Sequence, residues 1–134
     1  MIRFFRKAKK AGLPPGTLIH TGEPTSEAVT LSCFRYNEKE METVSAAELT
    51  DALLSRPSDK VVWINVDGIH RVAVIEKIGR AFGIHPLTQE DVVNTGQRPK
   101  LETYDDYLFI VLKMLYMDEA MDEVRAEQVS LVLG

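Results

Sequence analysis

The stretch that decides the fold is Val61-Val-Trp-Ile-Asn-Val-Asp-Gly-Ile-His70. Its first six residues, 61–66, are almost continuously apolar, which is typical of a central strand covered on both faces. The turn that follows leads into an apolar pattern of helical spacing, which predicts a helix over 70–82. Gly83 is well placed to be the left-handed cap of that helix. The middle of the chain therefore predicts a buried strand followed by a helix that packs on a sheet.

Further elements are predicted on both sides of this unit. Before it, alternating apolar residues predict a short edge strand and a hairpin, at 17–20, 29–36 and 41–44. Ser45 and Glu48 have the spacing of a capping box, which predicts a helix over 45–55. After it, the pattern predicts one short helix and three strands, at 86–94, 100–104, 107–117 and 127–133.

The order of these elements defines the expected fold class. Strands and helices in this order predict an α/β (α+β) domain, with a mixed parallel and antiparallel sheet and helices packed on its faces. Residues 61–66 and 108–112 are expected to be its most buried strands, because both segments are apolar on both faces.

Composition limits what the chain can be. It has 134 residues, 45% of them hydrophobic and 27% charged, which predicts one ordinary globular domain. The formal net charge of −4 and the lack of a basic stripe argue against a nucleic-acid partner. No apolar run reaches the roughly 18–20 residues that a membrane-spanning helix requires, so the chain is expected to be soluble. The basic, proline- and glycine-containing residues 1–16 predict a flexible leader, and 17–134 the domain itself.

Residue types also argue against several chemistries. Cys33 is the single cysteine, which rules out an internal disulfide and a cysteine-based zinc site, and its alternating surroundings predict a buried small hydrophobe. The three histidines lack the spacing of a zinc hydrolase. Asn65, Asp67 and His70 gather at the predicted strand-to-helix turn, where turn chemistry is the simpler interpretation. No catalytic residues are assigned, and the chain is not expected to be an enzyme.

The acidic pair Glu90 and Asp91 is the best candidate for a binding site. With Asn94 as a possible accessory residue, the two carboxylates fall on one face of the predicted short helix. Carboxylate and amide oxygens suit Mg²⁺ or Ca²⁺, but three groups make only part of a cage. The alternative is an ordinary solvated helix face.

Four blocks of sequence occur in an order typical of a known family. They read Val-Trp-Ile-Asn-Val-Asp-Gly-Ile-His at 62–70, Phe-Gly-Ile-His-Pro-Leu-Thr-Gln-Glu-Asp-Val-Val-Asn at 82–94, Gln-Arg-Pro-Lys-Leu-Glu-Thr-Tyr-Asp-Asp-Tyr-Leu-Phe-Ile-Val-Leu-Lys-Met at 97–114, and Glu-Gln-Val-Ser-Leu-Val-Leu at 127–133. Over about 17–134, this set closely resembles the soluble cytoplasmic domain of the CorA family of magnesium and cobalt transporters.

The resemblance implies an architecture and an assembly. The resemblance implies a subunit of a pentameric channel. Each such subunit has an α/β/α-layered cytoplasmic domain, a stalk helix and two membrane helices. A Gly-Met-Asn loop marks the pore mouth and does not occur in this chain. The chain therefore looks like the N-terminal part of the cytoplasmic domain, on the cytoplasmic face of the inner membrane. Without the stalk and the C-terminal membrane helices, it is expected to be a monomer or weak dimer.

The resemblance also implies a regulatory role. In the family, divalent ions between subunits hold the pore closed, and the positions that match the acidic helix here are Asp91 first and Glu90 second. The implied function is sensing of intracellular Mg²⁺ by a Mg²⁺/Co²⁺ transport protein, with Mg²⁺ as the regulatory ion and Co²⁺ as a possible second ion. The alternative is a free-standing soluble ligand- or metal-binding module that shares the fold.

Overall fold

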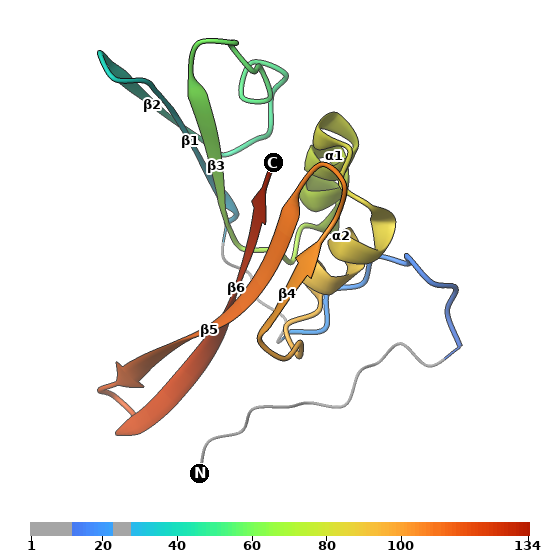
Figure 1. The fold of residues 1–134 in the computed structure, drawn as a ribbon. Helices are drawn as coiled ribbons and strands as arrows, with labels where there is room; N and C mark the ends of the chain where they lie inside the picture. The colour runs from blue at the N-terminus through green and yellow to red at the C-terminus, as the bar shows by residue number, and fades with distance from the viewer. Residues whose placement is uncertain (1–11, 23–27) are drawn as a thin grey trace. The chain divides into compact units, whose positions relative to one another are not determined.

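The computed structural model of the protein describes residues 12–22 and 28–134. These residues divide into two compact units (Figure 1). One unit contains residues 12–22 together with 86–134, and the other contains residues 28–85. The predicted leader lies largely outside the described residues.

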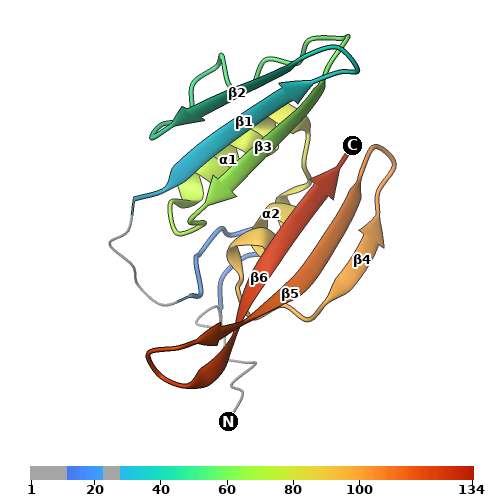
Figure 2. The same ribbon diagram turned by 90° about the vertical axis from the view of Figure 1, so that its left-hand side faces the viewer.

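The unit ending at His85 contains a three-stranded antiparallel sheet and one helix. Its strands are β1 (Thr30–Tyr36), β2 (Met41–Ala46) and β3 (Val61–Asp67), in the order β2-β1-β3. Helix α1 (Val72–Phe82) follows β3 and lies behind the sheet in the view of Figure 2. The hairpin predicted from the alternating residues is confirmed.

The core of this unit is built on the inward-facing residues of β1 and the residue before it. Val29, Leu31 and Cys33 are each at most 2% exposed, and they cluster with Leu53 and with Val74 of α1. Burying an aliphatic side chain of this size stabilises a fold by about 1.5–3 kcal/mol. The prediction that Cys33 is a buried small hydrophobe is confirmed.

Helix α1 ends as its sequence predicts. Gly83 adopts a left-handed conformation with φ 66°, and its N–H donates to the carbonyl of Gly79. The helix begins two residues later than predicted, at Val72, and it buries Val74 and Ile75.

The helix predicted over 45–55 is wrong. Ser45 belongs to β2, whose last residue Ala46 pairs with Leu31 of β1. Residues 51–54 form only turns, in which the amides of Leu53 and Leu54 donate to carbonyls three residues earlier. Pairing with the central strand outweighs the local capping signal, because it satisfies the backbone groups and buries Leu31 at the same time.

The central place predicted for 61–66 is also wrong. Strand β3 lies at an edge of its sheet, and Val61 and Trp63 are 54% and 55% exposed. The centre belongs to β1, which pairs with both neighbours. A continuous apolar run identified a strand correctly but not its position in the sheet.

The other unit also contains one helix and a three-stranded antiparallel sheet. Helix α2 (Pro86–Val93) precedes β4 (Lys100–Thr103), β5 (Leu108–Asp118) and β6 (Glu123–Leu133). The strands form an antiparallel sheet in the order β4-β5-β6, and both views place α2 beside it (Figures 1 and 2). The short helix and the three strands are confirmed, although β6 begins four residues earlier than predicted. The edge strand predicted at 17–20 is not found.

The core of this unit lies on one face of β5. Phe109 and Val111 are fully buried, as are Val93 and Thr88 of α2. The prediction for 108–112 therefore holds for the position of the strand and for alternate residues, but Leu112 is 46% exposed.

The fold class is α+β, with two antiparallel sheets and two helices among the described residues. All strand pairs of those residues are antiparallel, so the parallel part of the expected mixed sheet is not found. A parallel pair needs a crossover connection. The helical connection between β3 and β4 joins strands of different sheets instead.

Candidate metal-binding site on helix α2

Helix α2 is held in place by a polar face. Thr88 is fully buried, and its hydroxyl lies 3.0 Å from the hydroxyl of Tyr107. The side chain of Gln128 in β6 donates to the carbonyl of Asp91 at 3.3 Å. These contacts fix the helix against the sheet and leave Glu90 and Asp91 partly exposed.

Asp91 is paired within its own chain. Its Oδ2 accepts a hydrogen bond from Lys100 Nζ at 2.6 Å, and its Oδ1 accepts one from the Gln97 side chain. The Asp91 side chain keeps 25% of its surface exposed. The same ammonium of Lys100 donates to Glu102 Oε1, also at 2.6 Å, so one cation bridges two carboxylates.

The bridge fixes the charges of Lys100 and Glu102. Burial lowers the pKa of Lys100, but the hydrogen bonds to Asp91 and Glu102 outweigh it, and the net pKa is raised. The hydrogen bond from Lys100 is the main reason why the pKa of Glu102 is lowered. Lys100 is therefore a permanent cation at neutral pH, and Glu102 is a permanent anion.

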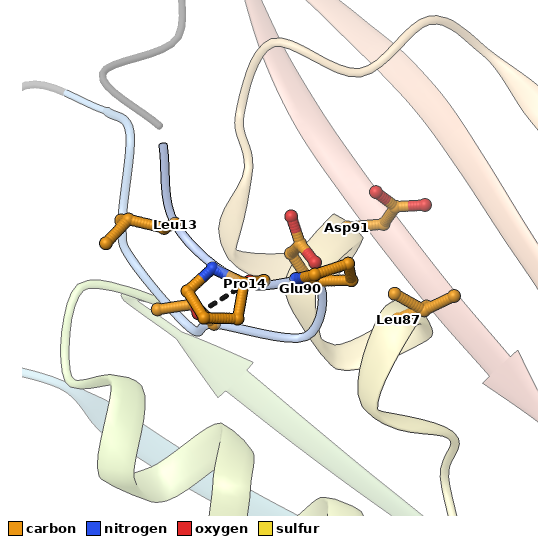
Figure 3. Close-up of a pocket in the computed structure, with 7 residues that line it drawn as sticks. Leu13, Pro14, Leu87, Glu90 and Asp91 are labelled. Atoms are coloured by element: carbon orange, nitrogen blue, oxygen red, sulfur yellow. Dashed lines mark hydrogen bonds between the residues drawn. The ribbon is translucent and has the colours of Figure 1, made fainter. Parts of the chain in front are cut away.

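Glu90 faces a different neighbour. Its Oε2 accepts a hydrogen bond from the backbone N–H of Gly16 at 2.7 Å. Figure 3 shows the Glu90 carboxylate beside Pro14, while the Asp91 carboxylate points away from this segment. A pocket of about 450 Å³ lies here, lined by Leu13, Pro14, Pro15, Thr17, Leu87, Glu90 and Asp91.

Asn94 serves the loop after α2. Its Oδ1 accepts hydrogen bonds from the hydroxyl of Thr21 at 2.9 Å and from the N–H of Gly96 at 3.2 Å. Thr21 in turn accepts the N–H of Thr95. These bonds indicate a turn-forming role, so the accessory role suggested for Asn94 has no support from its contacts.

Of the three residues predicted for the site, Glu90 and Asp91 lie on α2 and Asn94 follows the end of this helix, and their side chains do not converge. Within the two described ranges, no group of three or more His, Cys, Asp or Glu side chains is arranged to hold a metal ion. Asp91 still fits a hard cation, because it places a carboxylate on a fixed helix with 25% of its side chain exposed. Mg²⁺ keeps several waters and usually takes only one or two protein carboxylates. The geometry fits one side of a shared site.

Sequence reasoning missed the residues that support Asp91. Gln97, Lys100 and Gln128 all contact it, and Lys113 Nζ donates to the Thr95 carbonyl at 2.9 Å and to the Gln128 side chain. Burial lowers the pKa of Lys113. The alternation of Lys100 and Glu102 on one strand signals their pairing, but their link to Asp91 depends on the tertiary fold.

The second cluster considered from the sequence behaves as a turn. The side-chain amide of Asn65 donates to Asp67 Oδ2 at 3.0 Å. Gly68 follows with φ 96°, a conformation that favours glycine, and a side chain there would meet the ring of His70. These contacts are local, in agreement with the turn interpretation.

Comparison with known proteins gives the class of protein. The profile of the family described as CorA-like Mg2+ transporter protein matches residues 58–134. The cobalt/magnesium transport protein CorA of Thermotoga maritima is 43% identical to this chain over 128 residues, which is 96% of this chain and 36% of that protein. The chain therefore belongs to the CorA-like Mg²⁺ transporter family, as its sequence blocks predicted.

The match has a defined extent. The chain spans about a third of the length of the relative from Thermotoga maritima. Across residues 12–22 and 28–134, no helix is both long and apolar enough to cross a membrane.

Proposed function

We propose that this chain is the cytoplasmic, regulatory part of a CorA-like divalent-cation transport protein, and that Asp91 with Glu90 forms half of a Mg²⁺-sensing site between subunits. The proposal is supported by the family and by the name of the relative, a cobalt/magnesium transport protein. The whole protein would be a pentamer at the inner membrane, with Co²⁺ as a possible further ion.

The observation that carries the proposal is the position of Asp91. Its side chain is 25% exposed on a helix that is fixed by buried polar contacts, so it can meet an ion at the surface without a rearrangement of the fold. Because α2 offers too few converging ligands for a complete site, the remaining oxygens must come from water and from another subunit.

Such a half-site can regulate by differential binding. Carboxylates on two subunits that share an ion favour the arrangement that brings them together. Without the ion the same carboxylates repel one another across the interface. Intracellular Mg²⁺ would then stabilise the closed state, and loss of the bound Mg²⁺ would allow the protein to leave that state.

The test uses the full-length protein and measures Mg²⁺-dependent protection from protease together with ion flux. The double variant Glu90→Gln and Asp91→Asn removes both charges but keeps oxygen acceptors for the Gly16 amide and the Lys100 ammonium. We expect it to lose Mg²⁺ protection and inhibition of flux by Mg²⁺.

The matched control is Asp105→Asn with Asp106→Asn, two exposed neighbouring acids in the β4–β5 turn. The control should behave as wild type. If the α2 double variant keeps wild-type Mg²⁺ protection and inhibition, Glu90 and Asp91 are an ordinary helix face and the proposal is wrong.

A further inference from the structure

The bridge made by Lys100 is a feature that the sensing role does not by itself require. One ammonium lies 2.6 Å from Asp91 Oδ2 and 2.6 Å from Glu102 Oε1. The Lys100 side chain is 25% exposed, and its ammonium also lies 5.3 Å from the ring centroid of the fully buried Phe109. A cation of the protein thus occupies the carboxylate that would receive the metal.

We propose that Lys100 is a built-in competitor of the divalent cation at Asp91, and that it sets the Mg²⁺ concentration at which the site fills. This inference rests on the proposed function, because it assigns a regulating residue to the same site. It adds a third member, Glu102, which holds Lys100 when Asp91 takes the ion.

Competition follows from the geometry at Asp91 Oδ2. A hydrogen bond of 2.6 Å from an ammonium uses the lone pair and the negative charge that an incoming cation needs. The incoming ion must displace Lys100 or accept the repulsion of a positive charge at contact distance. Either requirement lowers the apparent affinity of Asp91 for Mg²⁺.

Glu102 keeps this competition reversible. When Asp91 binds the ion, Lys100 retains its hydrogen bond to Glu102 and its place near the Phe109 ring. The ammonium is therefore not left unpaired in a partly buried position, which would oppose metal binding much more strongly. Two carboxylates that share one cation allow an exchange in which every charge keeps a partner.

The experiment titrates the full-length protein with Mg²⁺ alone and measures the midpoint of protease protection. Lys100→Met keeps the length of the side chain and removes its charge. We expect its midpoint to fall about five- to tenfold, the size expected for loss of a charge-assisted contact that is partly exposed. Lys100→Arg keeps the charge and should stay within about twofold of wild type.

Lys60→Met is the matched control. Lys60 also pairs with a glutamate at 2.7 Å, Glu40, but belongs to the other compact unit. Lys60→Met makes the same change in net charge without removing a partner of Asp91. It should therefore leave the midpoint unchanged. The midpoint shift of Lys100→Met should have about the same size in roughly 0.3 M KCl as at low salt, because charges in direct contact are screened less than distant charges.

Glu102→Gln tests the exchange in the opposite direction. It leaves Lys100 with Asp91 as its single carboxylate, and the midpoint should rise about two- to threefold. This variant and Lys100→Arg also decide the matter if Lys100→Met fails to fold.

Several results would overturn the inference. These are an unchanged midpoint in Lys100→Met, an equal shift in Lys60→Met, a shift in Lys100→Arg as large as that in Lys100→Met, or no rise in Glu102→Gln. Failure of the proposed function is distinct, because then the variant with Glu90→Gln and Asp91→Asn would keep its Mg²⁺ response.

Discussion

Helices α1 and α2 each accompany a three-stranded antiparallel sheet, but they are attached in different ways. Helix α1 packs Val74 into an aliphatic core, with Ile78 against it, and ends at a left-handed glycine. Helix α2 buries Thr88 and Gln89 besides Val93, and it depends on hydrogen bonds to side chains from β6 and from the β4–β5 turn.

The difference separates a structural helix from a helix that presents charges. Apolar contacts are non-directional, so they fix α1 without fixing the direction of any polar group. Hydrogen bonds are directional, so they hold α2 in one orientation and thereby aim Asp91. The burial of polar side chains by α2 is consistent with a site, and the burial of apolar side chains by α1 is consistent with a scaffold.

The largest effect is expected in the two cores. Leu31→Ala in β1 and Phe109→Ala in β5 should each reduce the free energy of unfolding by about 3–5 kcal/mol, because both side chains are buried and leave cavities. Urea denaturation followed by circular dichroism measures the loss. Leu101→Ala, at a side chain 63% exposed, is the control and should change it by less than about 0.5 kcal/mol. Similar losses at all three positions would contradict the assignment of the cores.

A smaller effect is expected where α2 differs from α1. Thr88→Val removes one hydroxyl from a fully buried position at constant size and should cost about 1–2 kcal/mol in the same measurement. Thr103→Val, at an exposed threonine of β4, should cost nothing measurable. If Thr88→Val proves as stable as wild type, hydrogen bonding does not attach α2 and the contrast with α1 fails.

A pH titration examines the charges near α2. Because the pKa of Glu102 is lower in the folded chain than its ordinary value of 4.5, its pairing contributes stability that is complete above that value. This stability is lost as the pH falls through the lower folded pKa. Carbon-13 NMR of the 134-residue chain should show the lowered pKa, and Lys100→Met should move it back toward 4.5. An unchanged Glu102 titration in that variant would show that Lys100 does not hold the carboxylate in solution.

The smallest effect is expected on assembly. The proposed site on the 134-residue chain is only half of a Mg²⁺ site, so added Mg²⁺ should leave the chain a monomer or weak dimer. Light scattering at micromolar concentration, with and without EDTA, measures the mass. The mass of five chains would contradict this expectation.

Local signals predicted the parts of the fold that local interactions decide. Gly83 ends α1 because the required left-handed conformation is a property of that residue, and Pro86 begins α2 for a similar reason. Ser45 misled because its capping signal competes with a strand pairing that depends on Leu31, distant in sequence. The apolar run at 61–66 identified a strand, but a run cannot specify which strand obtains two neighbours.

The candidate site was predictable to the same degree. Glu90 and Asp91 were selected as candidates because they are adjacent on one helix, and the family to which the chain belongs was evident from its sequence blocks. Lys100 was not found, because its contact with Asp91 requires the turn after α2 and the start of β4 to bring the two together. Contacts between residues on different elements do not follow a fixed spacing in the sequence, so the sequence pattern does not reveal them.

The lowered pKa of Lys113 distinguishes this amine from other lysines, so it can report on the loop after α2 that it contacts. A lysine with a lowered pKa holds more of the uncharged, nucleophilic form at mildly alkaline pH than exposed lysines do. Reductive methylation with carbon-13 formaldehyde would therefore give Lys113 a methyl resonance with its own titration. Since Lys113 contacts Thr95 and Gln128, and Gln128 contacts Asp91, that resonance would sense movements of the loop after α2.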